Sequence, residues 1–396
     1  MEEDKFALVE KIIRDIDNVM SKNAELCAFD IVPVESNIRN KSPVLHLENC
    51  LGLESWCVKH VYIYCYNDLM DKYFTKPKRK SSKPTLANSE RLAVLLNVTL
   101  LINPELSSLW NKRRDMFLGC LMEKTSELQF TKILQICELA SDRSPNNYHS
   151  WNHRIWVLDT LKKYRKQYHI ALLFIKEYGF SERWASKHIS DFSCFHYRQY
   201  CIKNILTIDN THWKKIESTM DNILWNSLVC TLTNNFPKDA NIQVSEDSLA
   251  SYSEEQLVNL VLSHGNKTCN CTTNSVSVCQ QVEVLFYELV LNNELLRFYK
   301  HHETLWYHRR FVVHELICLM YEYFGFVRQN GALVKKTCRK CNECQKQAKI
   351  VRYDCNRVYS SILFNILISH EKRFVDERRI DGDMYYTGYL FLPSSA

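Results

Sequence analysis

The sequence is poor in the two residues that most often interrupt helices. Its 396 residues include only 8 glycines and 8 prolines, far below the usual share of each. So few helix breakers in so long a chain favour a helical protein. The hydrophobic content of 46% is enough for a large core, in one elongated domain or two compact ones.

Several targeting and binding signals are also missing. No apolar run of about twenty residues occurs, so no membrane-spanning helix is expected. The segment Met1–Lys5 is acidic and has no apolar core, which argues against a secretory signal. Residues 392–396 have no cysteine four from the end, so they are not a prenylation signal. The net charge of +6 is mild and does not indicate a nucleic-acid binder.

Cysteine, in contrast, is abundant. The chain has 17 cysteines, an odd number, which is unusual for a framework of disulfides. Without a secretory signal, we expect a reducing, cytoplasmic location and mostly free, buried thiols.

A tetrad, Trp-x-x-Arg, recurs along the chain. It comprises Trp110 with Arg113, Trp151 with Arg154, a weaker copy with Phe195 and Arg198, and Trp306 with Arg309. The aromatic positions are 41, 44 and 111 residues apart. A period near forty residues is typical of helical repeat arrays. Such arrays mostly bind other proteins along a curved face.

Each repeat is predicted to be a hairpin of two helices. An apolar stripe forms helix A, a short turn follows, and helix B carries the tetrad. In the first two turns, Asn103 and Ser144 precede Pro104 and Pro145. Asn or Ser suits the N-cap and Pro suits the first helical position. The sequence therefore predicts an all-α fold, an α–α superhelix of hairpins forming a right-handed solenoid.

The repeated residues are expected to hold the hairpins together. An apolar residue follows each tetrad aromatic by seven positions, which places both on one stripe of the helix. The Arg is expected to stack on the aromatic ring of a neighbouring repeat or to bond its C-terminal carbonyls. Stacking of the repeats is thus the expected role of Trp110, Arg113, Trp151, Arg154, Phe195, Arg198, Trp306 and Arg309.

Changes in composition divide the chain into segments. The stretch 76–88 is basic and bracketed by prolines; it is read as a solvated linker, with a nuclear-localisation signal as the alternative. The segments are a helical lead-in (1–75), the linker (76–88), repeats with a following helix (89–233), a polar and largely disordered insertion (234–280), the last tetrad repeat (281–329), a Cys/Lys-rich loop (330–350), and a terminal helix with a tail (351–396).

The second repeat resembles that of protein prenyltransferase α subunits. The family pattern reads approximately Pro-x-Asn-Tyr-x-x-Trp-x-x-Arg, and the segment from Pro145 to Arg154 is similar to it. The resemblance extends over about 89–208 and 282–324. It implies a crescent of helical hairpins around a barrel-shaped β subunit. That partner would hold zinc and geranylgeranyl diphosphate, and the β subunit of Rab geranylgeranyltransferase is one candidate.

The resemblance also implies where this chain departs from its family. The family's α subunits have a Lys five residues before the Trp, which helps the diphosphate to leave. In this sequence that position is Asn146, an amide that cannot neutralise charge. Tyr148 matches the family's Tyr, and the adjacent His149 is either a compensating group or a capping residue. In the third repeat, Phe192 and Ser193 replace a Tyr-His pair.

A cysteine cluster gives a competing signal. Cys338, Cys341 and Cys344 form two overlapping Cys-x-x-Cys steps. With a fourth ligand from Cys355, Cys269 or Cys271 they can form a zinc knuckle. The alternative is a loop of free thiols.

Two functions remain open from the sequence. One is the α subunit of a heterodimeric protein geranylgeranyltransferase, inactive alone, which modifies proteins with C-terminal cysteines. The other is a non-catalytic scaffold that binds another protein. Neither reading expects a cofactor in this chain, nor a nucleic-acid partner.

Overall fold

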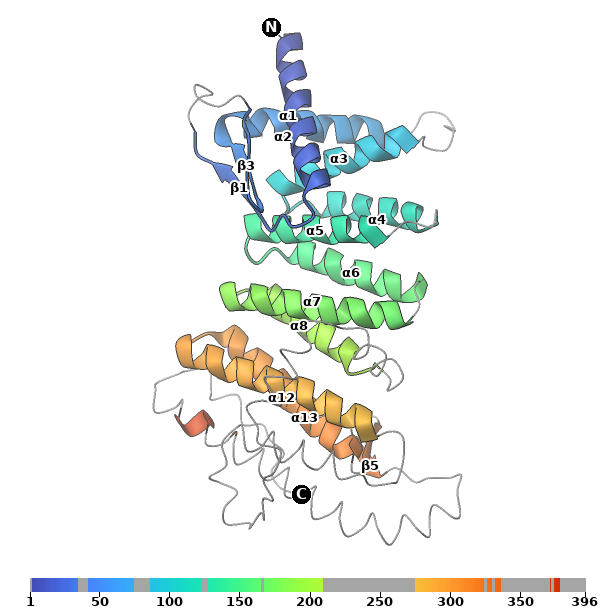
Figure 1. The fold of residues 1–396 in the computed structure, drawn as a ribbon, viewed down its shortest axis with the longest axis vertical. Coiled ribbons are helices and arrows are strands. Elements are labelled where there is room, and N and C mark those ends of the chain that lie inside the picture. Colours follow the sequence, from blue (N-terminus) through green and yellow to red (C-terminus); the bar gives the residue numbers. More distant parts are fainter. Residues whose placement is uncertain are drawn as a thin grey trace. The chain divides into compact units, whose positions relative to one another are not determined.

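Helical hairpins dominate the computed structural model (Figure 1), which confirms the all-α fold class. The structure describes residues 2–34, 42–74, 86–122, 127–164, 167–208, 275–323, 326–329, 332–335, 371 and 374–377. The chain divides into two compact units, Met1–Tyr164 and Arg165–Ala396. Within the described part, no helix is both long and apolar enough to cross a membrane.

Unit 1 contains two A/B hairpins. The helices are α3 (Leu86–Ile102) with α4 (Ser107–Met122), and α5 (Glu127–Arg143) with α6 (Tyr148–Tyr164). Unit 2 contains α7 (Gln167–Lys187) with α8 (Phe192–Ile205), and α12 (Ser275–Phe298) with α13 (Glu303–Tyr323). In all four hairpins the turn between the helices has four residues. Each tetrad lies on the second helix, as the sequence predicts.

The N-terminal segment differs from the expected helical lead-in. It begins with α1 (Glu2–Lys22) and ends with α2 (Ser55–Leu69), which continues as the π-helical turn η1 (Met70–Phe74). Between them lie β1 (Ala28–Val32), β2 (Val44–Leu47) and β3 (Cys50–Glu54). β3 is central, parallel to β1 and antiparallel to β2. Leu51 and Leu53 are buried at alternate positions of β3, the period of a strand rather than a helix.

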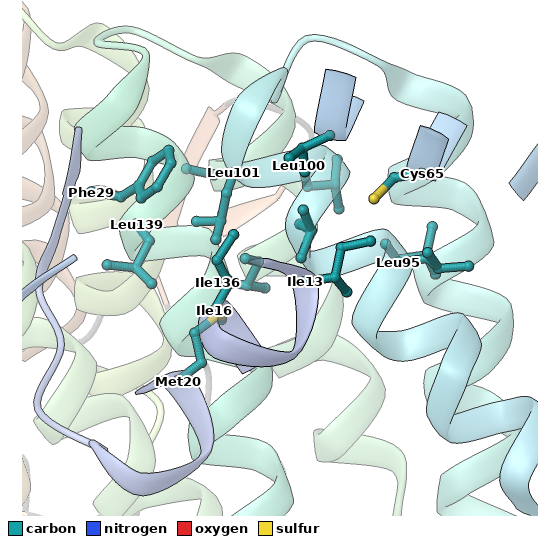
Figure 2. Packing of buried hydrophobic residues seen from close by; sticks show 14 of the residues in the cluster. Ile13, Ile16, Met20, Phe29, Cys65, Leu95, Leu100, Leu101, Ile136 and Leu139 are labelled. Carbon is teal, nitrogen blue, oxygen red and sulfur yellow. The ribbon is translucent and has the colours of Figure 1, made fainter. Parts of the chain in front are cut away.

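The core of unit 1 joins this segment to the first hairpins (Figure 2). Ile13, Ile16 and Met20 form the buried stripe of α1. They belong to one cluster with Leu95 of α3 and Leu139 of α5. At the edge of the sheet, the amide of Phe29 donates a 3.0 Å hydrogen bond to the carboxylate of Asp142 on α5. The sheet therefore has a buried apolar contact and a polar anchor on the second hairpin.

Other segment boundaries also move. α3 begins at Leu86, inside the expected linker, and α12 begins at Ser275, inside the expected polar insertion. After α13, the strands β4 (Phe326–Gln329) and β5 (Ala332–Lys335) pair antiparallel, so the start of the expected loop at 330–350 contains a strand. The remainder of the linker, the insertion and that loop lies outside the described residues, as does most of the terminal segment 351–396.

Candidate functional site

The tetrad residues are buried on the second helix of every hairpin. The aromatic side chains fill the interior, and the arginines beside them are buried as well. This holds for Trp110, Arg113, Trp151, Arg154, Phe195, Arg198, Trp306 and Arg309. A buried guanidinium needs hydrogen-bond partners, so the contacts of each Arg show which parts of the hairpin it connects.

Each tetrad Arg bonds back to the first helix of its own hairpin. Arg154 donates to the carbonyl of Leu134 at 3.1 Å, and Arg198 donates to that of Tyr178 at 2.9 Å. Arg113 and Arg309 donate instead to the side chains of Asn97 and Asn293. The sequence predicts contacts with a neighbouring repeat, whereas the contact common to all four copies lies within one hairpin.

The turn before α6 corrects the predicted cap. The helix begins at Tyr148, and the residue that caps it is Asn147, not Ser144. The Asn147 side-chain oxygen accepts a 2.8 Å bond from the amide of Ser150. Its amide nitrogen donates to the carbonyl of Pro104 at 3.2 Å and to Glu105 at 2.7 Å. Asn147 thus ties the second turn to the first.

The prolines have a role other than the predicted one. Pro104 and Pro145 lie within the turns rather than at the first helical position. The carbonyl of Pro104 accepts a 2.8 Å hydrogen bond from the indole of Trp110. This bond accounts for the six-residue spacing between the proline and the aromatic residue in the first repeat.

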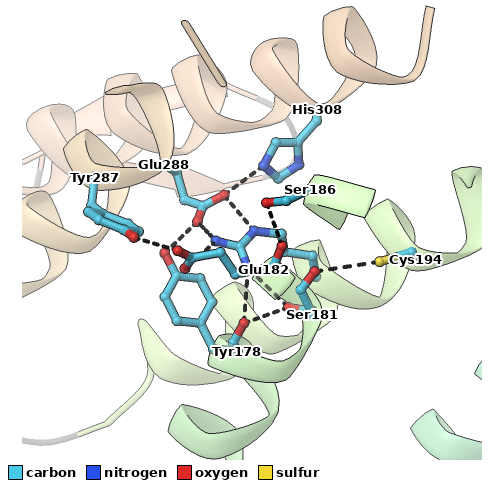
Figure 3. Close-up of polar contacts among 9 residues, drawn as sticks. Tyr178, Ser181, Glu182, Ser186, Cys194, Tyr287, Glu288 and His308 are labelled. Carbon is cyan, nitrogen blue, oxygen red and sulfur yellow. Dashed lines mark hydrogen bonds and ion pairs between the residues drawn. The ribbon is translucent and has the colours of Figure 1, made fainter. Parts of the chain in front are cut away.

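In unit 2 a carboxylate links two hairpins (Figure 3). Glu288 of α12 receives hydrogen bonds from Arg198 of α8, with its Nε at 3.0 Å, and from Tyr178 of α7. The other side of Glu288 contacts His308 of α13, whose Nε2 lies 2.7 Å away. All four side chains are buried. Burial by itself raises the pKa of Glu288, but Arg198 and His308 outweigh that effect and hold it at about 2.

The same arrangement recurs at the end of unit 2. Arg309 of α13 donates to Glu371 through Nε at 3.0 Å and Nη2 at 2.8 Å. Its guanidinium carbon also lies 3.7 Å from the ring centroid of Phe374. A buried Glu therefore neutralises the tetrad Arg of both hairpins in this unit.

Among the described residues of unit 1, no carboxylate contacts Arg113 or His153. His153 occupies the position before Arg154 that His308 occupies before Arg309. Its ring is fully buried, and neither nitrogen has a hydrogen-bond partner. Burial, together with the positive Arg113 and Arg114, holds the pKa of His153 well below its ordinary value. Burial also lowers the pKa of Arg113 to about 10. This interior therefore concentrates positive charge.

The residues predicted to border a diphosphate lie together at the start of α6. Asn146 is exposed and has a positive φ of 64°, a conformation that Asn tolerates better than most residues. Tyr148 is 61% exposed. The ring of His149 lies 5.9 Å from that of Tyr148, edge to face. Phe192, at the start of α8, is also exposed.

From the sequence, Arg114 matches the family pattern beside Arg113, but no contact of its side chain is predicted. This residue follows Arg113 on α4, and its guanidinium carbon lies 5.3 Å from the ring centroid of Trp156 on α6. Its Nε is buried without a hydrogen-bond partner. The Arg113–Arg114 doublet was the available signal, but only one of two neighbouring residues can share the tetrad's buried stripe.

In the described ranges, no three His, Cys, Asp or Glu side chains gather closely enough to hold a metal ion. None of the eight cysteines whose side chains the structure describes is assigned to a disulfide. Cys338, Cys341 and Cys344, with the proposed fourth ligands Cys355, Cys269 and Cys271, lie outside the described residues.

A family model matches three parts of the chain, residues 130–161, 174–205 and 285–316, and its description is protein prenyltransferase alpha subunit repeat. The chain therefore resembles prenyltransferase α subunits in these three segments. The matched segments correspond to the hairpins α5–α6, α7–α8 and α12–α13, and they have equal lengths. Trp151, Phe195 and Trp306 therefore share one repeat position, and Ile133, Glu177 and Glu288 share another.

Several curated proteins are similar to this chain. The chain is 26% identical to the human protein prenyltransferase alpha subunit repeat-containing protein 1, over 78% of each chain. It is 25% identical to the 1-A form of Xenopus laevis, over 78% of this chain and 73% of that one. It is also 26% identical to the geranylgeranyl transferase type-2 subunit alpha of Candida albicans, over 30% of this chain and 32% of that protein.

Proposed function

We propose that this chain is the α subunit of a heterodimeric protein geranylgeranyltransferase. The observation that carries the proposal is the set of three prenyltransferase α subunit repeats, each folded as a hairpin with its tetrad buried. The similarity to a geranylgeranyl transferase type-2 subunit alpha favours a geranylgeranyl group over a farnesyl group. A barrel-shaped β subunit is the proposed partner and would hold the zinc and most of the lipid.

The proposed reaction transfers an isoprenoid to a cysteine near the C-terminus of a protein. The cysteine loses its proton, and the thiolate attacks C1 of the isoprenoid diphosphate. A carbon–sulfur bond forms as the C1–oxygen bond breaks, and the electron pair leaves with the diphosphate. Negative charge grows on that leaving group, so cationic and hydrogen-bond-donating groups around it lower the barrier.

Reconstitution tests this proposal. The full-length chain is co-expressed with the β subunit of a type-2 geranylgeranyl transferase, and the mixture is separated by size exclusion. We expect a stable 1:1 complex that transfers labelled geranylgeranyl to a cysteine-terminated protein faster than farnesyl. The β subunit alone serves as the control. A chain that forms no complex, or a complex no more active than the control, contradicts the proposal.

A second candidate is a scaffold without a transferase role. Two features favour it: Asn146 stands where a Lys is expected, and Phe192 with Ser193 replaces a Tyr-His pair. A scaffold of this kind would bind the β subunit, or another protein, without changing its activity. The same reconstitution decides between the two candidates, because only the first predicts transfer that depends on this chain.

A further inference from the structure

Two turns of unit 2 lie side by side at one end of its hairpins. The turn between α7 and α8 spans residues 188–191, and the turn between α12 and α13 spans residues 299–302. The hydroxyl of Ser190 lies 3.1 Å from Nδ1 of His302, and the hydroxyl of Thr304 donates a 2.7 Å hydrogen bond to the carbonyl of Ile189. We call the exposed side chains of residues 183–192 and 294–307 the turn face of unit 2.

Aromatic side chains are exposed on the turn face. Phe298, the last residue of α12, is 82% exposed, the highest value for a large hydrophobic side chain in the described part of the chain. Phe192, at the start of α8, is about half exposed, and Tyr299 and Tyr307 are also exposed. A group of exposed aromatic side chains marks an interaction surface, because an isolated protein gains nothing by leaving them in water.

The cations of the turn face lie close to these rings in the chain. Arg297 and Lys300 flank the pair Phe298 and Tyr299, and both are exposed. Arg183 and Lys187 are exposed on the last turns of α7. Their spacing of four residues places them on one side of that helix. Each of the two turns therefore has a pair of cations beside it.

Carboxylates do not balance these cations. Asp191 is buried, and its side chain caps α8 by accepting a hydrogen bond from the amide of Cys194. Glu294 and Glu303 are the other acidic residues of 183–192 and 294–307. Four cations thus face two solvent-accessible carboxylates, and the turn face has a net positive charge without any contribution from its histidines.

We propose that the turn face of unit 2 docks on the surface of an anionic membrane. A membrane surface presents an anionic layer directly above an apolar one, so it satisfies cations and aromatic rings that lie side by side. Phe298 and Tyr299 enter the boundary between headgroups and acyl chains, where aromatic rings are favoured. Arg297 and Lys300 contact the phosphates and carboxylates of the headgroups. This attachment is separate from the proposed transferase activity and does not depend on it.

A general attraction between a basic chain and anionic lipid predicts something different. The whole chain has a net charge of +6, so cations elsewhere would then serve equally well. Lys163 and Tyr164 end α6 in unit 1, and both are exposed. They repeat the chemistry of Lys300 and Tyr299 outside the turn face. The double variant Lys163→Gln/Tyr164→Ser is therefore the matched control for Tyr299→Ser/Lys300→Gln.

The first experiment measures binding of the full-length chain to vesicles by co-sedimentation. We expect binding to an equal mixture of phosphatidylserine and phosphatidylcholine, and little binding to phosphatidylcholine alone. Tyr299→Ser/Lys300→Gln should weaken binding about tenfold or more, and Phe298→Ser about fivefold or more. Phe298→Trp should retain it, and the control Lys163→Gln/Tyr164→Ser should leave it unchanged.

Three outcomes of this experiment overturn the proposal. The first is the absence of binding to the mixed vesicles. The second is equal binding to vesicles with and without phosphatidylserine. The third is equal weakening by Tyr299→Ser/Lys300→Gln and by the control, which would assign the binding to the net charge of the chain.

The second experiment locates the contact by peptide-resolved hydrogen exchange. Mixed vesicles should slow exchange in peptides that cover residues 294–307 and leave the end of α6 unchanged. The measurement is repeated after addition of the β subunit. A turn face that the β subunit protects, with loss of vesicle binding, would be a protein interface, and the membrane proposal would be wrong. A β subunit that forms no complex counts against the proposed function alone, because the vesicle measurements use this chain without it.

Discussion

The hairpins of units 1 and 2 share a geometry but differ in charge. In unit 1 the ring of Trp110 lies 5.0 Å from that of His153, which stacks at 5.9 Å on Trp156. In unit 2 the ring of Phe195 lies 5.2 Å from that of His308, which stacks at 6.1 Å on Phe311. The aromatic framework is thus repeated almost unchanged. Only His308 has a carboxylate partner.

One repeat position explains the difference. Glu288 lies twenty residues before His308, and Ile133 lies twenty residues before His153. Because Glu288 contacts both His308 and Arg198 of the preceding hairpin, its replacement by Ile in unit 1 leaves two basic groups without an anion. The stack of aromatic rings therefore does not require the buried ion pair. In unit 2 the ion pair is added to the stack at Glu288, whereas the described residues of unit 1 place no carboxylate beside Arg113 and His153.

Removal of the carboxylate from unit 2 should have the largest effect. Glu288→Gln leaves the buried Arg198 without a neutralising charge, and we expect a loss of about 3–5 kcal/mol in the free energy of unfolding. Urea unfolding followed by hydrogen exchange of α7, α8, α12 and α13 measures it. Glu294→Gln, on an exposed position of the same helix, is the control and should change little. Equal losses in the two variants would show that Glu288 does not hold these hairpins together.

Addition of a carboxylate to unit 1 should have an intermediate effect. We expect Ile133→Glu to place an acid beside Arg113 and His153, as Glu288 lies beside Arg198 and His308. A double-mutant cycle with Arg113→Met should give a coupling free energy of about 1–3 kcal/mol. Ile133→Gln is the uncharged control and should show little coupling. A charged variant that couples no more strongly than Gln would mean that the two units are not equivalent at this position.

Acid should distinguish the two units with a smaller effect. The pKa of His153 is depressed from its ordinary value of 6.5, so the folded chain keeps the ring neutral while the unfolded chain takes up a proton. The contribution of neutral His153 to the free energy of unfolding is therefore fully present above about pH 6.5 and decreases as the pH falls. Glu288, depressed from 4.5 to about 2, contributes stability above its ordinary pKa, and this contribution is lost as the pH falls toward 2.

Between pH 6.5 and 4.5, unit 1 should weaken while the Glu288 site of unit 2 holds. Urea unfolding monitored unit by unit, with peptide-resolved hydrogen exchange corrected for intrinsic rates, tests this difference. His153→Phe keeps the aromatic contacts and removes two buried unpaired nitrogens. It should add about 1–2 kcal/mol to the stability and abolish the acid sensitivity of unit 1. A variant that weakens with acid as the wild type does would assign the effect to another group.

The fold was largely predictable from the sequence because its repeats are local. The tetrad spacing and few helix breakers sufficed for the second helices. The helix caps were not predictable in this way. The Ser144–Pro145 pair matches a common helix-start signal, but the residue that caps the helix is Asn147, which also contacts another turn. The strand Ala28–Val32 was missed because a five-residue strand carries little periodicity beside two long helices.

The candidate site was only partly predictable. The resemblance pointed to Asn146, Tyr148 and His149, which lie at the start of one helix. The charged partners of the tetrads could not be found in the same way. Glu288 and Glu371 lie 90 and 62 residues beyond the arginines that they neutralise, and no local pattern links them. The contact of Arg114 with Trp156 depends on the packing of α4 against α6, which no local sequence pattern predicts.

The buried cysteines of α2 can report on local opening of the N-terminal segment. Burial raises the pKa of Cys57 to about 11 and that of Cys65 to about 12, so neither thiol reacts at neutral pH while α2 stays in the core. Cys27 and Cys50, beside and within the sheet, are exposed. An alkylating reagent should therefore label Cys27 and Cys50 rapidly, but Cys65 only when α2 detaches from the core. The labelling rate of Cys65 then reports on the local opening of α2.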